Sequence, residues 1–220
     1  MKRDPDPEDA VQRLSRRSFL KGAGGAAAGG ALATEIARGA NPSGPGPGAP
    51  LLTGETEVSF QLNGAPVSVR VEPRTTLLSA LRHHLKPAHT AAKSVCEQGS
   101  CGACTVLLDD EPISACLTLA VRVEGRRVRT AAGLAQGDAL SPVQEAMCAD
   151  DALMCGFCTP GFAMSITACL EKNPQATEEE VREACAGNLC RCGTYPHVFS
   201  AALKAGREMA SAKAKGGQGR

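Results

Sequence analysis

The segment CGFCTPG (155–161), with GNLCRCG (187–193) further along the chain, decides how the protein can fold. Each segment contains a close pair of cysteines, the first spaced C-x-x-C and the second C-x-C, and a helical pattern separates the pairs. Four thiolates offered as two close pairs can bind one compact metal centre. Zinc commonly binds paired cysteines, but C-x-C is a tight spacing for a zinc knuckle. The same spacing suits a [2Fe–2S] cluster, in which two thiolates bind each iron.

A second cysteine motif lies upstream and favours iron over zinc. The segment CEQGSCGAC covers residues 96–104, and Cys116 follows it. This C-x4-C-x2-C…C order is the plant-type ferredoxin spacing for a [2Fe–2S] cluster. Glycines in the loop let the backbone approach a cluster closely, with N–H groups directed at its sulfurs. The two motifs together predict two iron–sulfur sites.

Length and composition exclude several classes of protein. A chain of 220 residues can hold one or two small domains plus tails. The net charge is +1, aromatic residues make up 3% and tryptophan is absent, so the basic surface with stacking aromatics that nucleic-acid binding requires is missing. Eleven cysteines would suit a secreted disulfide protein, but the odd count and the metal-type spacings argue against a complete disulfide framework.

The N-terminal region, residues 1–40, is predicted to be an export signal. Ser15–Lys21 reads SRRSFLK, the twin arginine of a bacterial Tat signal. The Ala/Gly-rich stretch 20–33 is too short and too weakly apolar to span a bilayer, so no stable membrane span is expected. Cleavage sites are offered at Ala31-Leu32-Ala33 and at Ala37-Arg38-Gly39. The alternative is a disordered basic N-terminus; the Tat interpretation places the protein in the periplasm.

A Pro/Gly-rich linker, residues 41–54, precedes a β-rich unit predicted over 55–130. Apolar and polar residues alternate over 58–62 and again over 67–71, on either side of Asn63-Gly64. Alternation around this favoured turn pair predicts a β-hairpin.

The rest of the β-rich unit combines one helix with further strands. Thr75 and Thr76 can cap a helix that Pro87 ends. The first cysteine loop comes next, then a strand over 104–108, an Asp-Asp-Glu-Pro turn and renewed alternation over 121–130. A mixed sheet packed on a helix is the ferredoxin-like β-grasp pattern.

After a connector, residues 131–140, the pattern becomes helical over 141–209. Ser141-Pro142 is a good N-cap and first position of a helix. Thr159-Pro160 opens a second helix, and Asn173-Pro174 ends it.

Two more helices complete a predicted four-helix bundle. Thr177–Glu180 reads as a capping box, and Tyr195-Pro196 starts the last helix. Residues 210–220 are expected to be a disordered basic tail. Two of the four helices begin just after a cysteine pair, so their positive dipole ends would point toward an anionic cluster. The overall prediction is an α+β fold, with a β-grasp domain followed by a helical bundle.

Three further cysteines lie outside the two motifs. Cys169 and Cys185 fall on apolar helix faces, where cysteine packs as a small hydrophobe. Cys148 is less clearly placed, and a stray disulfide remains open for it. A Rieske cluster would need C-x-H pairs, which the sequence lacks, so the histidines of the β-rich unit are expected to be exposed or capping: His83, His84 and His89.

Four segments resemble the iron–sulfur subunit of the xanthine oxidase family of molybdenum hydroxylases. They are CEQGSCGACTV (96–106), ACLTLAV (115–121), CGFCTPG (155–161) and GNLCRCGTY (187–195). The resemblance covers roughly residues 55–209. With its Tat leader and Pro-rich linker, the chain most resembles the small subunit of periplasmic aldehyde oxidoreductases.

The resemblance implies two [2Fe–2S] clusters and two partner subunits. By motif, the first cluster would be held by Cys96, Cys101, Cys104 and Cys116, and the second by Cys155, Cys158, Cys190 and Cys192. A large partner would hold molybdopterin, often as the cytosine dinucleotide, and a medium partner would usually hold FAD. The subunit would have no catalytic residue of its own: it would relay electrons from molybdenum through the bundle cluster and then the β-grasp cluster to FAD or another acceptor.

The resemblance also singles out two positions near the pterin. Cys192 would reach toward the cofactor in the partner subunit. Many relatives have glutamine immediately before CGFC, whereas this chain has Met154, which accepts hydrogen bonds poorly.

Competing interpretations stay open on the sequence alone. The favoured activity is aldehyde oxidation by an exported molybdenum hydroxylase. Hydroxylation of N-heterocycles of the isoquinoline type, and a standalone two-cluster ferredoxin, are alternatives. A zinc- or disulfide-stabilised binding module would make the spacings coincidental.

Overall fold

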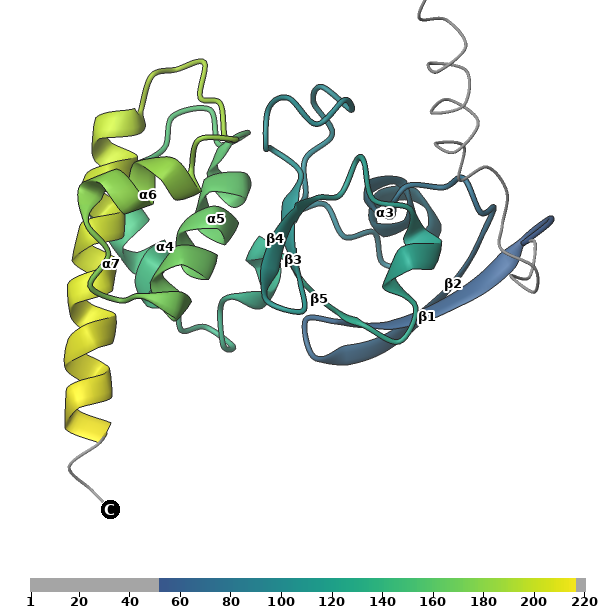
Figure 1. Cartoon of the computed structure of the whole chain (residues 1–220), viewed down its shortest axis with the longest axis horizontal. Helices are drawn as coiled ribbons and strands as arrows, with labels where there is room; N and C mark the ends of the chain where they lie inside the picture. The colour runs from purple at the N-terminus through teal and green to yellow at the C-terminus, as the bar shows by residue number, and fades with distance from the viewer. Residues whose placement is uncertain (1–51, 217–220) are drawn as a thin grey trace, which may run out of the picture. The chain divides into compact units, whose positions relative to one another are not determined.

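The structure, a computed structural model, describes residues 52–216 and consists of a mixed β-sheet followed by helices (Figure 1). The expected signal region and most of the linker lie outside the described residues. Sheet and helices belong to one compact unit that begins at Leu52. The predicted α+β class is confirmed.

The first two strands form the hairpin that the alternation predicts. Strand β1 (Thr56–Leu62) pairs antiparallel with β2 (Ala65–Val71). Asn63 and Gly64 have φ angles of 52° and 85°, which fits the left-handed turn that matches the twist of a hairpin. The Asn63 side chain also accepts a hydrogen bond from the backbone N–H of Thr130, at 2.8 Å, and so ties the turn to the end of the sheet.

The sheet has the order β2-β1-β5-β3-β4. Strand β5 (Arg127–Arg129) runs parallel to β1 and antiparallel to β3 (Thr105–Leu108), which pairs with the edge strand β4 (Glu111–Ser114). One face of the sheet packs on the helix that starts with α3 (Leu77–Ser79), capped by the Thr76 hydroxyl.

Two local predictions in this unit are wrong. The expected Asp-Asp-Glu-Pro turn is shorter, because Asp109 and Asp110 alone make it, at φ 49° and 72°, while Glu111 and Pro112 belong to β4. Proline lacks a ladder N–H, and an edge strand tolerates this loss. The alternation over 121–130 predicts strand throughout, but its first part lies in a 3₁₀ helix, η4 (Ala120–Val123).

The short helix near the first cysteine loop has a wide last turn. After α3 it continues as a π-helix, η3 (Ala80–His84), and Leu85 resumes extended backbone before Pro87. His83 and His84 at its end are exposed. Leu77 and Leu81 on its inner side are fully buried against the sheet.

Helices α4 (Pro142–Ala149), α5 (Thr159–Lys172), α6 (Glu178–Ala184) and α7 (Tyr195–Gly216) follow the sheet. The residues predicted as caps form capping boxes: Ser141 with Gln144, and Thr177 with Glu180. The connector contains one 3₁₀ turn, η5 (Ala131–Gly133).

The expected disordered tail is wrong up to Gly216, because α7 continues that far. Residues 217–220 lie outside the described part. Among the described residues, no helix is both long enough and apolar enough to cross a membrane.

Sheet and helices meet along α5. Leu107 of β3 packs against Met164 and Ala168 of α5 in a small buried cluster. At the rim of this contact, the Arg129 guanidinium donates to the Glu171 carboxylate at 2.9 Å. The two cysteine-containing parts of the chain are therefore joined by packing and by ion pairing.

Candidate iron–sulfur sites

The first cysteine loop lies between η3 and β3 and has almost no regular secondary structure. Cys104 and Cys116 are buried, whereas Cys96 and Cys101 are partly exposed. Gly99, at φ 75°, lies under Leu117, and a Cβ atom added there would be 2.3 Å from the Leu117 Cδ1 atom. The positive φ at this position favours glycine, which lets the loop turn tightly beside its cysteines.

The four thiols of this loop act on one another electrostatically. The backbone N–H of Gln98, together with the Cys101 thiol, lowers the pKa of Cys96 to about 6. Burial raises the pKa of Cys104 to about 11; the Cys116 backbone N–H opposes this rise, and the Cys116 and Cys101 thiols add to it. The Cys96 thiol therefore contacts the Cys101 thiol, and the Cys104 thiol contacts the Cys116 thiol and feels the charge of Cys101.

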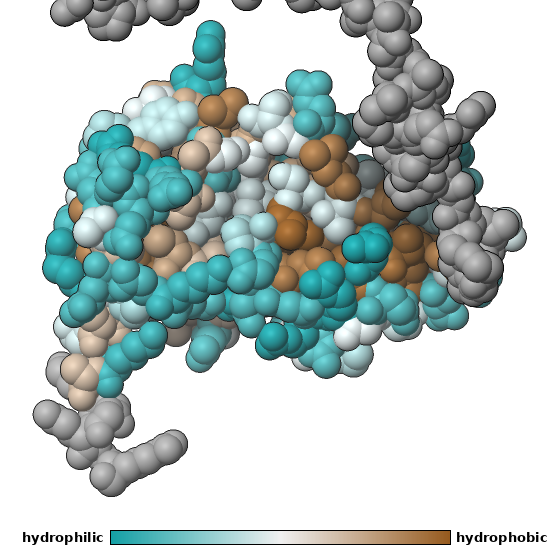
Figure 2. All heavy atoms as spheres, in the orientation of Figure 1, coloured by the Kyte–Doolittle hydropathy of each residue, from teal (hydrophilic) through white to brown (hydrophobic). Residues whose placement is uncertain are grey.

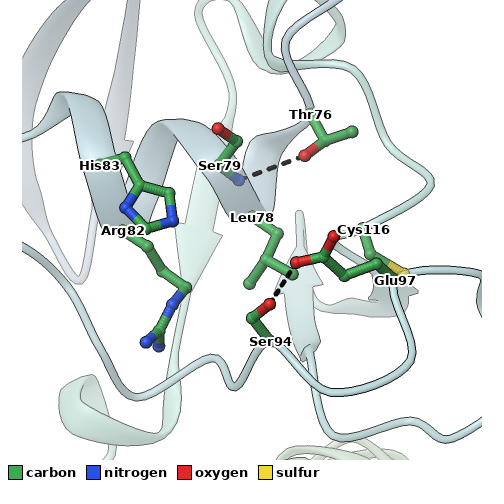
Figure 3. A pocket seen from close by; sticks show the side chains of 8 residues that line it. All are labelled: Thr76, Leu78, Ser79, Arg82, His83, Ser94, Glu97 and Cys116. Carbon is green, nitrogen blue, oxygen red and sulfur yellow. Dashed lines mark hydrogen bonds between the residues drawn. The ribbon is translucent and has the colours of Figure 1, made fainter.

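A cavity of about 290 Å³ reaches Cys116 from the side of η3 (Figure 3). Arg82 spans one wall, and its guanidinium donates to the backbone carbonyls of Ala92, at 2.8 Å, and Thr90, at 3.2 Å. On the other wall, the Ser94 hydroxyl donates to the Glu97 carboxylate. These contacts hold both ends of the segment that leads into Cys96.

The second cysteine set lies where α5 begins and where the loop after α6 ends. Cys158, half-buried, occupies the N-cap position of α5 and Cys190 is buried, whereas Cys155 and Cys192 are exposed. The set therefore has an inner pair, Cys158 and Cys190, and an outer pair, Cys155 and Cys192. Helix α5 begins directly after Cys158, so its N-terminal dipole end faces the thiols, as predicted.

The thiols of the second set also act on one another. Burial and the neighbouring Cys190 thiol raise the pKa of Cys158 to about 12. Burial alone would raise the pKa of Cys190, but hydrogen bonds with Thr194, the Cys158 thiol and the Cys192 backbone together outweigh it and bring the value to about 7. A backbone hydrogen bond from Cys155 lowers the pKa of Cys192, but the neighbouring Cys155 and Cys190 thiols raise it overall.

Aromatic residues fix the position of Cys190. The backbone N–H of Cys190 donates to the Tyr195 hydroxyl at 2.8 Å. The Tyr195 ring packs edge-on against the fully buried Phe162, with 5.8 Å between the ring centroids. The inner pair is therefore supported directly by the core of the helical part.

Both sets match the donor chemistry of a [2Fe–2S] cluster. Each offers four thiols that interact in pairs, and two thiolates bind each iron of such a cluster. Within residues 52–216, no three Cys, His, Asp or Glu side chains are arranged to hold a single metal ion.

The remaining cysteines lie apart from these sets. Cys185 is buried and Cys169 packs against the same helical core, as their apolar positions predict. Cys148 is exposed, and it too is a free thiol.

Several large apolar residues close in sequence to the second cysteine set are exposed. Met154 is 70% exposed, and Phe157 and Leu189 are each more than half exposed. Figure 2 shows one face, where apolar patches interrupt the polar surface mainly over the sheet. Exposed apolar residues gathered at one place commonly mark a contact with another protein.

Comparison with known families gives matches over most of the chain. Residues 60–134 match the 2Fe-2S iron-sulfur cluster binding domain, and residues 130–203 match the [2Fe-2S] binding domain. Residues 13–33 match the twin-arginine translocation pathway signal sequence.

Individual relatives extend these matches. The nicotine 6-hydroxylase small subunit of Paenarthrobacter nicotinovorans is 47% identical over 156 residues, 71% of this chain and 93% of that protein. The aldehyde oxidoreductase iron-sulfur-binding subunit PaoA of Escherichia coli O157:H7 is 38% identical over 169 residues, 70% of this chain and 73% of that protein. The crystal structure of quinoline 2-oxidoreductase from Pseudomonas putida 86 matches with a TM-score of 0.68 and 42% identity, over 71% of this chain and 96% of that chain.

The chain belongs to the small iron–sulfur subunits of the xanthine oxidase family of molybdenum hydroxylases. It has two [2Fe–2S]-binding domains, and partner subunits of this family carry molybdopterin and FAD.

The sequence did not predict the residues other than cysteine that hold the cysteine loops in place. Arg82, Asn188, Thr194 and Tyr195 all contact the cysteine loops through hydrogen bonds. Asn188, Thr194 and Tyr195 lie within the segment GNLCRCGTY, so closeness to the C-x-C pair was the available signal. Nothing in the sequence connects Arg82 with the loop that it holds.

Proposed function

We propose that this protein is the electron-relay subunit of an exported molybdenum hydroxylase. The observation that carries the proposal is the pair of four-thiol sets within one compact unit. When bound, two [2Fe–2S] clusters would supply one-electron carriers between a two-electron oxidation in one partner and an acceptor in another.

The chain's own part is to hold and shield the clusters. Cys96, Cys101, Cys104 and Cys116 would bind the first; Cys155, Cys158, Cys190 and Cys192 would bind the second. The sheet unit, 55–130, forms a β-grasp domain, and α4 to α7 form a four-helix bundle over 141–209, with 131–140 as connector. No residue of this chain does acid–base chemistry.

The second set faces the large molybdenum-binding partner. The support is the exposure of the outer pair, Cys155 and Cys192, and of the apolar residues near them in sequence, Met154, Phe157 and Leu189. Burial of this surface would remove water from the outer pair and stabilise the complex. Cys192 is the residue that would lie nearest the pterin, which we expect to be the cytosine dinucleotide form.

A medium FAD-binding partner completes the assembly. Electrons would leave through the first set to FAD or to another acceptor. The small-subunit and subunit names of several relatives support larger partners in general, as in caffeine dehydrogenase subunit gamma.

The substrate of the complex is an aldehyde, oxidised to a carboxylic acid. Similarity to PaoA, together with the Tat signal, supports this choice. A second candidate is hydroxylation of an N-heterocycle, which the higher identity to the nicotine 6-hydroxylase small subunit favours.

The protein acts in the periplasm. The match to a twin-arginine signal over residues 13–33 supports export in the folded state, because that route carries folded proteins. Clusters could then be inserted, and partners bound, before export.

Purification of the tagged chain from its native host tests the proposal. We expect a brown complex that contains molybdenum, FAD and two further subunits and that oxidises aldehydes with a dye as acceptor. Turnover of nicotine- or quinoline-like heterocycles instead would select the second candidate. A brown monomer without partners would indicate a standalone ferredoxin, and a colourless zinc protein would refute the relay altogether.

A further inference from the structure

One buried amide side chain connects the two cysteine loops. Asn188 is 4% exposed and lies two positions before Cys190. Its Nδ2 group donates to the backbone carbonyl of Gly102, at 3.0 Å, and to the Thr105 hydroxyl, at 3.4 Å. Its Oδ1 atom accepts from the Ser165 hydroxyl of α5, at 2.7 Å. From its place in the second loop, Asn188 thus contacts the first loop at Gly102, the start of β3 at Thr105 and helix α5 at Ser165.

The backbones of the two loops touch at the same place. The N–H of Leu189 donates to the carbonyl of Cys101 at 2.9 Å. Each of these residues is a predicted ligand or the direct neighbour of one, since Cys190 follows Leu189. A short run of covalent bonds and one hydrogen bond therefore connects the two thiol sets.

Glycines make this contact possible. A Cβ atom added to Gly161, in the first turn of α5, would be 2.2 Å from the Gly102 carbonyl oxygen. Gly102 itself has a φ of 67°, and a Cβ atom there would be 2.4 Å from the Gly187 carbonyl oxygen. At this junction between the two cysteine loops there is no room for a methyl group at Gly102 or at Gly161.

We propose that Asn188 is a positioning residue for electron transfer between the two clusters. The inference rests on the proposed relay function and deepens it. The amide fixes the separation of the two loops, and so keeps the Leu189 N–H bonded to the Cys101 carbonyl. Buried hydrogen-bond networks that are fully satisfied select one geometry, and this one selects the geometry between the two thiol sets.

The Gly102 carbonyl shows that the role is more than satisfying a buried acceptor. That oxygen already accepts from the Thr105 backbone N–H, at 3.1 Å, and from the Thr105 hydroxyl, at 2.7 Å. Removal of the Asn188 amide would therefore leave it with two partners. What the amide adds is the connection across the junction.

Two variants disturb the junction in different ways. Asn188→Ala removes the connecting amide, and Gly161→Ala keeps it but inserts a methyl group against Gly102. The matched control is Gly187→Ala, because a Cβ atom at that neighbouring position meets nothing within 4 Å and its φ is not in the left-handed region. Each full-length variant is first assayed for iron and acid-labile sulfide.

Electron paramagnetic resonance of the fully reduced protein is the decisive readout. Dipolar coupling between two reduced clusters falls with the cube of their separation, so it reports the junction directly. We expect Asn188→Ala and Gly161→Ala to retain both clusters, to lose the wild-type splitting and to equilibrate electrons more slowly after flash reduction. Gly187→Ala should match the wild type in all three respects.

The other possible outcomes contradict either the positioning role of Asn188 or the proposed relay function. Wild-type splitting and exchange rate in both junction variants would overturn the positioning role, as would an equal change in Gly187→Ala. If Asn188→Ala lacks a cluster, Gly161→Ala decides; if both lack one, the junction serves assembly and the inference is wrong. A wild-type protein without iron and sulfide would refute the proposed function itself.

Discussion

Replacement of Tyr195 by phenylalanine tests how the helical core supports the second cysteine set. The substitution removes one oxygen, the acceptor for the Cys190 backbone N–H at 2.8 Å, and leaves the ring contact with Phe162 in place. That N–H has no other acceptor among residues 52–216, and a partly buried donor left unpaired costs at most about 1–3 kcal/mol. For a domain of this size the thermal midpoint falls by roughly 2–4 °C per kcal/mol, so we expect a decrease of roughly 2–12 °C.

The assay compares cluster-loaded wild type and Tyr195→Phe at one scan rate, because unfolding that releases a cofactor depends on the rate of heating. Ser211→Ala is the control: it removes a hydrogen bond to the Arg207 carbonyl on the exposed end of the same helix, and we expect a change within about 0.5 kcal/mol. The variant should also shift the resonance signal of the second cluster and leave that of the first unchanged. An unaltered midpoint together with two unaltered signals would refute the role assigned to Tyr195.

Three further predictions concern the ligands, the export signal and a spare thiol. Cys192→Ser should remove or damage the second cluster while the first stays intact in the resonance spectrum; a surviving second signal with normal turnover would show that Cys192 is no ligand. Replacing both Arg16 and Arg17 by lysine should block export, so that the active protein stays in the cytoplasm. Normal activity in the periplasm would mean that the signal was misidentified. Burial raises the pKa of Cys185 to about 12, so its reactive thiolate is nearly absent at about pH 8, and mass spectrometry after iodoacetamide treatment should show the exposed Cys148 labelled first. Equal labelling of the two would contradict the burial of Cys185.

Local chemistry explains which parts of the fold could be predicted from the sequence. Asn63-Gly64 selects a tight hairpin turn, and the hydroxyls of Ser141 and Thr177 satisfy N–H groups within three residues of themselves. These interactions depend on residues close together in the sequence, so they can be predicted without a structure.

Features set by distant contacts were missed. Residues 120–123 alternate as a strand would, yet the backbone N–H of Ala120 donates to the Thr75 carbonyl, and the segment turns as a 3₁₀ helix beside α3. The continuation of α7 past residue 210 was missed because its composition, rich in lysine, glycine and alanine, suits a tail as well as a helix.

The same distinction between local and distant interactions applies to the candidate iron–sulfur sites. Cysteine spacing and motif predict both four-thiol sets, because most ligands of one small cluster lie close together in the sequence. The connection between the sets depends on Asn188 meeting Gly102, a contact between residues far apart in the chain. Spacing within one motif carries no information about such a contact.

The cluster content of the purified full-length protein tests the central claim most directly. Two [2Fe–2S] clusters predict about four iron atoms and about four acid-labile sulfides per chain, with two separate resonance signals on stepwise reduction. Half that content with a single signal, or stoichiometric zinc without sulfide, would contradict a relay built from two four-cysteine sites.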